Sequence, residues 1–174
     1  MKTMTVSRAA AICGGRLTQY SDAPIGRAII DSRQVQPGDM FVAYRGENVD
    51  GHRFIAKALE AGASGIVVSN HGGRVLDHCP ATAEVLPEIV DAVGGKLTIF
   101  VDGAIRSGMD MFKALALGAD AVLIGRPFVT TVYGGGEEGV QLYVQKLKAE
   151  LADTMRMCGA HSLAEIKRSM LFGF

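Results

Sequence analysis

The chain has 174 residues, 48% hydrophobic and 21% charged, which is typical of one ordinary globular domain or two small ones and excludes a disordered chain. Its 18 basic and 18 acidic residues give no net charge, which argues against nucleic acid or an anionic membrane as a partner. There is no apolar run near the ~20 residues of a membrane span, no signal-peptide core and no metal-type cysteine spacing, so we expect a reduced, cytoplasmic protein without a metal site.

The amino-terminal part contains short elements separated by turns. Ser7 can cap a helix over Arg8–Cys13. Apolar runs predict strands over 28–31 and 40–44, separated by a turn at Pro37-Gly38-Asp39. An amphipathic pattern predicts a helix over 50–61.

From residue 62 onward a strand–helix pattern repeats. The predicted strands are 66–69, 97–101 and 121–125, and the predicted helices are 83–93, 109–117 and 138–157. A glycine-rich turn at 134–136 precedes the last of these helices, and a capping box at Ser162–Glu165 predicts a final short helix. The long helix carries one apolar face, formed by Val140, Val144, Leu147, Leu151 and Met155. This order predicts an α/β fold with a mostly parallel sheet and right-handed crossovers.

Polar residues and glycines follow each of these three strands. They are Asn70-His71-Gly72-Gly73-Arg74, Asp102-Gly103-Ala104-Ile105-Arg106 and Gly125-Arg126-Pro127. In parallel α/β proteins, ligands bind outside the carboxyl ends of the strands. The pattern therefore predicts a site for a small anionic ligand or cofactor.

Residues from about 61 to 172 resemble the final part of the FMN-dependent 2-hydroxy-acid dehydrogenases and oxidases, the family of glycolate and lactate oxidases. The matching stretches are 61–74, Val101-Asp102-Gly103, 112–119 and Ile124-Gly125-Arg126-Pro127. They cover roughly the last three strands of that family's eight-stranded barrel. Each motif alone is weak evidence for the family, since His-Gly-Gly and Asp-Gly are usually turns. Their joint occurrence at three successive strand ends indicates the lineage. Lineage does not by itself establish activity.

The resemblance implies roles for these residues. His71 would remove a proton from the substrate, and Arg74 would hold the substrate carboxylate by a two-pronged contact. The residues implied to hold FMN are Ser69, Asp102, Gly103, Arg106, Gly125 and Arg126. One departure is that Ala104 stands where the family usually has a second glycine, which would crowd the phosphate loop.

Residues 1–60 resemble instead the first domain of the Mur ligases, which extend UDP-muramyl peptides. The matching residues are Asp31-Ser32-Arg33, Val35, Pro37-Gly38-Asp39, Phe41-Val42-Ala43, Gly46, Asp50-Gly51-His52 and Phe54-Ile55. The resemblance implies a UDP-binding role for Ser32, Gly46 and Asn48. The alternative is that Asp31-Ser32 and Asp50-Gly51 are turn and cap residues. Ligase activity is excluded because the chain has no Gly-x-x-x-x-Gly-Lys-Ser/Thr loop.

The two resemblances meet near 59–65. We therefore interpret the chain as a chimera, engineered or recombinant, in which a Mur-like segment 1–60 and a partial barrel 61–174 merge into one structural domain. Arg45 stands where the flavin-contacting lysine of the hydroxy-acid family would be. We expect an open sheet in a three-layer arrangement rather than a half-barrel. A half-barrel would expose a concave apolar face, which a second copy of the chain would have to cover.

Three functional hypotheses follow. The first is a scaffold without complete catalytic activity that retains at most residual FMN or phosphate binding. The second is a working FMN-dependent 2-hydroxy-acid oxidoreductase, formed if two copies pair as a homodimer to complete the pocket. The third is a UDP-sugar-binding module.

Overall fold

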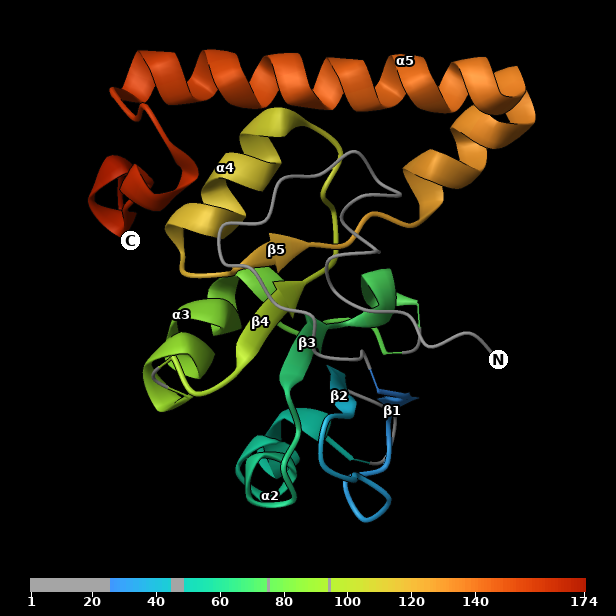
Figure 1. Cartoon of the computed structure of the whole chain (residues 1–174), viewed down its shortest axis with the longest axis vertical. Helices are drawn as coiled ribbons and strands as arrows, with labels where there is room; N and C mark the ends of the chain where they lie inside the picture. The colour runs from blue at the N-terminus through green and yellow to red at the C-terminus, as the bar shows by residue number, and fades with distance from the viewer. Residues whose placement is uncertain (1–25, 45–48, 75, 94) are drawn as a thin grey trace.

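The computed structural model describes residues 26–44, 49–74, 76–93 and 95–174, so the helix expected over Arg8–Cys13 lies outside the described residues. Five strands form one parallel sheet in the order β1-β2-β3-β4-β5 (Figure 1). They are β1 (Ala28–Ile29), β2 (Met40–Tyr44), β3 (Gly65–Ser69), β4 (Thr98–Val101) and β5 (Ala121–Val122). The sheet therefore joins strands from both sides of the expected junction near residue 60.

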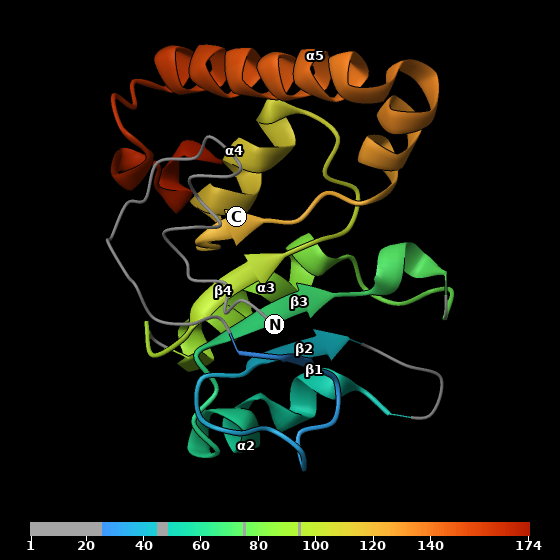
Figure 2. The ribbon, with the colours of Figure 1, turned by 45° about the vertical axis from the view of Figure 1, so that its right-hand side comes forward.

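The mostly parallel α/β class expected from the sequence is confirmed. Within this class, the strand order is that of a barrel segment. Each strand pairs with the strand before it in the chain, so right-handed crossovers place every connecting helix on the same face. The helices α2 (Ile55–Glu60), α3 (Thr82–Val93) and α4 (Gly108–Ala116) follow the sheet along one side (Figures 1 and 2). An open sheet with helices on both faces would need a reversal in strand order, which the described strands do not have.

Alternate strand residues form the core between the sheet and these helices. Phe41, Ile66 and Ile99 belong to this core, as do Ala43, Val68 and Val101, together with apolar residues of α2, α3 and α4. The residues between them, Val42, Val67 and Phe100, lie next to one another on adjacent strands. Because successive side chains of a strand point to opposite faces, these three face the other, concave side of the sheet. The concave side leads to the site described below.

Two of the early elements, the first strand and the first helix, are shorter than expected, because polar side chains interrupt them. β1 ends at Ile29, and the Asp31 carboxylate accepts a hydrogen bond from the Arg33 backbone at 3.0 Å in a turn. The helix expected over 50–61 is divided into a 3-10 helix, η1 (Gly51–Phe54), and α2. Asp50 caps η1 by accepting a hydrogen bond from the His52 backbone at 3.0 Å. The structure therefore shows Asp31 as a turn residue and Asp50 as a cap residue, which was the alternative to the Mur-like interpretation of these positions.

The later elements follow the prediction within a few residues. α4 starts one residue before the predicted helix because Ser107 and Asp110 form a capping box there. β5 is shorter than predicted and ends at Val122. The last described elements are two 3-10 helices, η3 (Leu163–Glu165) and η4 (Arg168–Met170). The Ser162 hydroxyl forms a hydrogen bond with the Glu165 carboxylate at 3.1 Å and does not cap the helix backbone.

The helix α5 (Arg126–Cys158) starts earlier than predicted and contains a kink. Gly136 has φ 54° and ψ −137°, so the expected glycine turn is present, but it joins two helical segments. The first segment was missed, although Pro127 is a residue typical of a first helical turn. The second segment packs on α4 through the predicted apolar face, with Leu147 buried.

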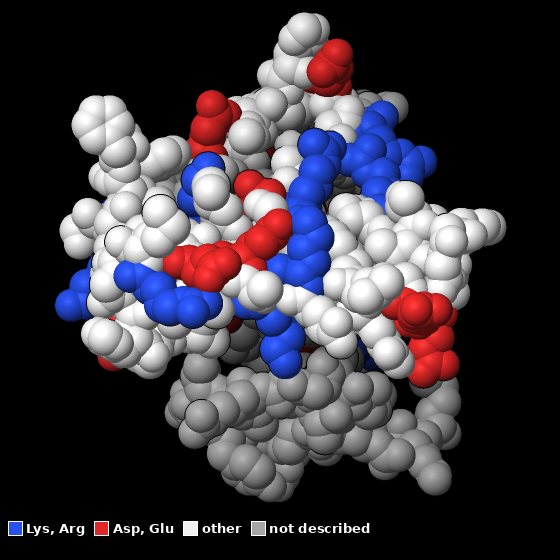
Figure 3. All heavy atoms as spheres, turned by 90° about the horizontal axis from the view of Figure 1, so that it is seen from above, with Lys and Arg blue, Asp and Glu red and all other residues white. Residues whose placement is uncertain are grey.

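The outer face over α5 carries charges of both signs side by side (Figure 3). Arg156 pairs with Asp153 on α5, and Lys146 pairs with Glu150, whose carboxylate also accepts a hydrogen bond from the Gly108 backbone of α4. Across the described residues, no helix combines the length and the apolar character needed to cross a bilayer.

Candidate functional site

A cleft of about 820 Å³ opens at the carboxyl ends of the strands. All eight residues that the sequence assigned to substrate and FMN line it: Ser69, His71, Arg74, Asp102, Gly103, Arg106, Gly125 and Arg126. They come from three loops, each following a different strand, and the parallel sheet brings them to one edge. Apolar side chains that the motifs did not indicate, among them Ile30, Val42 and Leu123, form part of the wall.

The first two loops are joined by a partly buried hydrogen bond. The Ser69 hydroxyl, at the end of β3, donates to the Asp102 carboxylate at 2.7 Å, and Ser69 Oγ accepts from the His71 backbone at 3.1 Å. Burial raises the pKa of the Asp102 carboxyl above its usual range, while the Ser69 hydroxyl and the nearby His71 act in the opposite direction. Ser69 therefore holds both the carboxylate and the histidine loop in place.

The histidine loop forms a tight turn, η2 (His71–Gly73). The Asn70 side chain caps it by accepting a hydrogen bond from the Gly72 backbone at 3.0 Å. His71 itself has φ 54°, a left-handed conformation that is unfavourable for a residue with a side chain. The exposed His71 side chain lines the cleft, and its ring has no hydrogen-bond partner among the described residues.

The loop after β4 makes a close approach at Gly103. Its φ is +99°, and a Cβ atom there would lie 2.9 Å from Thr82 Oγ1 and 3.2 Å from Asn70 Oδ1. Thr82 also donates a hydrogen bond to the Asp102 carbonyl at 2.6 Å, so α3 supports this loop. No spacing or motif in the sequence singles out Thr82, because its contact depends on how α3 packs.

Ala104 adopts φ +59° beside Gly103. Ala104 is the residue at which the sequence departs from the family that it resembles. The departure noted in the sequence therefore falls on a left-handed residue, where a Cβ atom is disfavoured.

Three arginines give the cleft its anion-binding character. The exposed guanidinium groups of Arg74 and Arg106 have no hydrogen-bond or ion-pair partner among the described residues. Arg126 makes one long contact, from Nη2 to the Gly72 carbonyl at 3.4 Å. Asp102 is the single acidic residue among the described lining residues. Guanidinium groups match carboxylate and phosphate geometry, so the cleft suits an anionic ligand.

The residues expected to bind UDP are not in this cleft. Ser32 is buried in the turn after β1 and does not line the cleft. Gly46 and Asn48 lie outside the described residues, as does Arg45. A UDP site at these positions stays a prediction.

The fold and the cleft together define a segment of a parallel α/β barrel with an arginine-lined cleft at the carboxyl ends of its strands. The family of FMN-dependent dehydrogenases matches residues 52–172, and the chain belongs to this family.

Similar proteins are 2-hydroxy-acid oxidases. The peroxisomal (S)-2-hydroxyacid oxidase GLO3 of Arabidopsis thaliana is 50% identical over 113 residues, which are 65% of this chain and 31% of that protein. An L-lactate oxidase of Roseobacter sp. (strain GAI101) is 48% identical over 118 residues, 68% of this chain and 32% of that protein. The crystal structure of a mandelate oxidase with benzoyl-formic acid matches with a TM-score of 0.68 and 42% identity, covering 76% of this chain and 38% of that one. The chain spans about a third of the length of the curated relatives it matches.

These findings confirm the resemblance of the carboxyl-terminal part and give no support to the Mur ligase resemblance. The family match starts at residue 52, inside the segment assigned to the Mur-like part. The likeness to mandelate oxidase covers 76% of the chain, more than residues 61–174 alone provide. The interpretation as a chimera is therefore less well supported than the alternative, an FMN-dependent 2-hydroxy-acid oxidoreductase.

Proposed function

We propose that the chain provides the substrate-binding and phosphate-binding side of an FMN-dependent 2-hydroxy-acid oxidoreductase. The observation that carries this proposal is the gathering of all eight residues assigned to substrate and FMN in one cleft. Membership of the FMN-dependent dehydrogenase family supports the same reading.

The residues present fit the phosphate end of FMN. Arg106 and Arg126 offer guanidinium donors, and the surroundings of Gly125 are open, with no atom within 4 Å of a Cβ built there. Open space at a glycine lets a phosphate approach the backbone N–H groups. Asp102 offers a carboxylate that can accept hydrogen bonds from ribityl hydroxyls. The volume of about 820 Å³ is within the range of small-molecule sites.

The chain's own part in the reaction is to bind and orient the 2-hydroxy acid and to accept a proton from it. Arg74 would hold the substrate carboxylate in a bidentate contact. His71 would accept the proton at a ring nitrogen, as a general base. When bound, FMN supplies the acceptor for the two electrons that leave the substrate.

Flavin titration tests the cofactor site. Two to three charge-assisted hydrogen bonds of about 1.5–3 kcal/mol each would together contribute roughly 4–6 kcal/mol, which corresponds to an FMN dissociation constant of roughly 0.05–1 mM. The substitution Arg126→Ala should weaken FMN binding by about 10- to 100-fold, measured by quenching of flavin fluorescence. Arg168→Ala, at an exposed arginine that does not line the cleft, is the matched control and should bind FMN as the wild type does. Equal affinity of both variants would refute the assigned site.

Substrate chemistry is tested separately. Glycolate or lactate added without oxygen should bleach the flavin absorbance of the loaded protein. His71→Ala should abolish the bleaching while leaving FMN affinity unchanged, because the residue acts on the substrate. Bleaching that persists in His71→Ala would remove the histidine from this role.

A second candidate function is FMN or phosphate binding without turnover. It is favoured by the lack of a described partner that orients the His71 ring, since a general base needs a fixed orientation. FMN binding without bleaching by any 2-hydroxy acid is the result this candidate predicts. The homodimer, the cytoplasmic location and UDP binding at Ser32 remain predictions from the sequence, and some similar proteins are named as peroxisomal.

A further inference from the structure

The helix α5 folds back on itself beside the cleft. Arg126 begins its first segment, and the kink at Gly136 separates this segment from the second. The two segments approach closely, since a Cβ atom on Gly139 would lie 2.5 Å from the Thr131 carbonyl oxygen. The rings of Phe128 and Tyr143 meet edge to face across the bend, with centroids 5.2 Å apart and an interplanar angle of 74°. Tyr143 is therefore packed against the segment that starts at Arg126.

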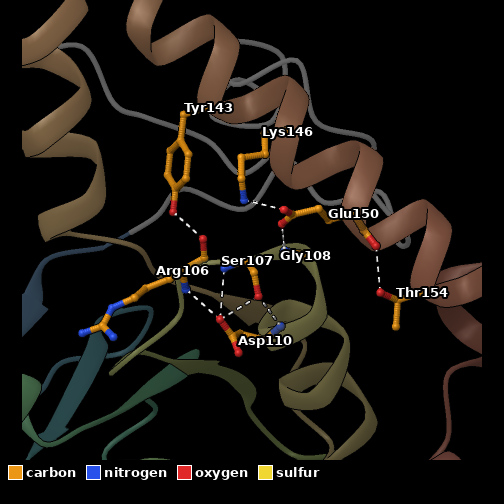
Figure 4. Close-up of polar contacts among 8 residues, drawn as sticks. All are labelled: Arg106, Ser107, Gly108, Asp110, Tyr143, Lys146, Glu150 and Thr154. Atoms are coloured by element: carbon orange, nitrogen blue, oxygen red, sulfur yellow. Dashed lines mark hydrogen bonds and ion pairs between the residues drawn. The ribbon is translucent and has the colours of Figure 1, made fainter.

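The second segment of α5 also holds the loop that carries Arg106 (Figure 4). The Tyr143 hydroxyl donates a hydrogen bond to the Arg106 carbonyl at 3.0 Å. About two turns further on, the Glu150 carboxylate accepts from the Gly108 backbone at 2.9 Å and pairs with Lys146. The Arg106 side chain itself extends away from α5 in Figure 4, so these contacts fix its backbone and leave its guanidinium free for the cleft.

Tyr143 thus contacts both arms of the phosphate site. Its ring packs on Phe128, two residues after Arg126, and its hydroxyl holds the backbone of Arg106. We infer that Tyr143 is a positioning residue that sets the distance between Arg106 and Arg126, and so the affinity for the phosphate of FMN. This inference rests on the proposed function. Hydrogen bonds weaken steeply with distance and angle, so a small displacement of either arginine should be seen in phosphate binding.

The test compares FMN with riboflavin, which has the same ring and ribityl chain but no phosphate. Tyr143→Phe keeps the ring contact and removes the bond to Arg106. We expect it to weaken FMN binding by about 3- to 10-fold and to leave riboflavin binding unchanged. Tyr133→Phe is the control, because Tyr133 lies on the first segment of α5 with 90% of its surface exposed.

Two further variants separate positioning from a general loss of structure. In an Arg106→Ala background, Tyr143→Phe should have little further effect on FMN affinity, because the guanidinium group that Tyr143 positions is already absent. Phe128→Leu, which removes the aromatic partner, should lower the ratio of FMN to riboflavin affinity in the same direction as Tyr143→Phe. A merely structural role would instead weaken both flavins together.

The outcomes distinguish the inference from the proposed function. If the wild type prefers FMN to riboflavin and Tyr143→Phe keeps that preference, the inference is overturned and the proposed function stands. If the wild type binds both flavins equally, the phosphate site is absent and both are overturned. A loss of FMN preference confined to Tyr143→Phe and Phe128→Leu supports the inference.

Discussion

At the residue scale, each of two loops that face the cleft contains a strained backbone position. His71 and Ala104 both adopt positive φ, at 54° and 59°. The Asn70 cap and the Ser69 hydroxyl support His71, whereas Ala104 is exposed and its side chain has no such support. Strain of this kind persists only where the surrounding structure imposes it, and here it lies beside the residues assigned to substrate and FMN.

Ala104→Gly should stabilise the protein. A left-handed residue with a Cβ atom costs about 1–2 kcal/mol, and the added freedom of glycine in the unfolded chain offsets about 0.4–1 kcal/mol of the gain. We expect the melting temperature to rise by about 1–3 °C in a thermal unfolding experiment. Ala152→Gly, at an exposed helical position of α5, is the control and should lower it, since glycine costs about 1 kcal/mol in a helix. A decrease for both variants would show that Ala104 is not strained.

Asp102 should make stability depend on pH in an unusual direction. Because burial raises its folded-state pKa, it contributes stability below the unfolded value of about 3.9 that is lost as the pH rises through the folded-state pKa. Asparagine cannot ionise, so Asp102→Asn should gain unfolding free energy relative to the wild type between about pH 3.5 and about pH 7. Urea unfolding at both pH values measures this difference.

The control for this prediction is Asp91→Asn, an exposed carboxylate on α3. Its difference from the wild type should be the same at both pH values. If Asp102→Asn behaves in the same way, the carboxylate is not held in a desolvated environment.

At the element scale, the bent helix α5 connects the scaffold to the cleft. Its second segment packs on α4, and its first segment begins at Arg126, a residue of the cleft. The bend between them requires the kink at Gly136 and the close approach at Gly139. A change far from the ligand in space can therefore alter the site through one helix.

Gly139→Ala should disturb this bend. The added Cβ atom would lie 2.5 Å from the Thr131 carbonyl oxygen, so the two segments must separate. Overpacking of this kind costs about 1–3 kcal/mol, and we expect a lower melting temperature together with weaker FMN binding. Gly135→Ala is the matched control, with no atom near its Cβ position, and should be neutral or slightly stabilising. The same effect from both substitutions would contradict a tight bend.

At the scale of the whole molecule, the strands before residue 61 are part of the same core as the later ones. β2 pairs with β3 over five residues, and Phe41 and Ala43 are fully buried in the core shared with α2, α3 and α4. The site rests on this sheet, because its loops follow β3, β4 and β5. We therefore expect the described part of the chain to unfold as one unit.

Phe41→Ala should destabilise the whole molecule, including the cleft. Removing a fully buried phenylalanine costs about 3–5 kcal/mol, which corresponds to a decrease of about 6–20 °C in melting temperature. Circular dichroism and loss of flavin binding should report the same transition. Phe172→Ala, at a fully exposed phenylalanine, is the control and should leave the transition unchanged. A separate, unshifted transition in Phe41→Ala would show two independent units.

Sequence reasoning located the strands and the polar strand ends because both are local features. The apolar run of β2 predicts its observed bounds, and the three strand-end motifs, which the sequence assigns to one site, line one cleft. The resemblance of residues 1–60 to Mur ligases was the weaker inference, since it rested on turn and cap residues such as Asp31 and Asp50, which recur in unrelated proteins.

The sequence by itself determined the α/β class, the family and eight of the residues that line the cleft, because periodicity, glycines and charged residues at strand ends are local features of the chain. Only the tertiary structure decided that the strands add in chain order with their helices on one face, since strand order depends on pairing between distant segments. It also decided that Thr82 supports Asp102 and that Tyr143 holds Arg106, which is 37 residues away. Contacts of this kind depend on how helices pack, and no local pattern encodes them.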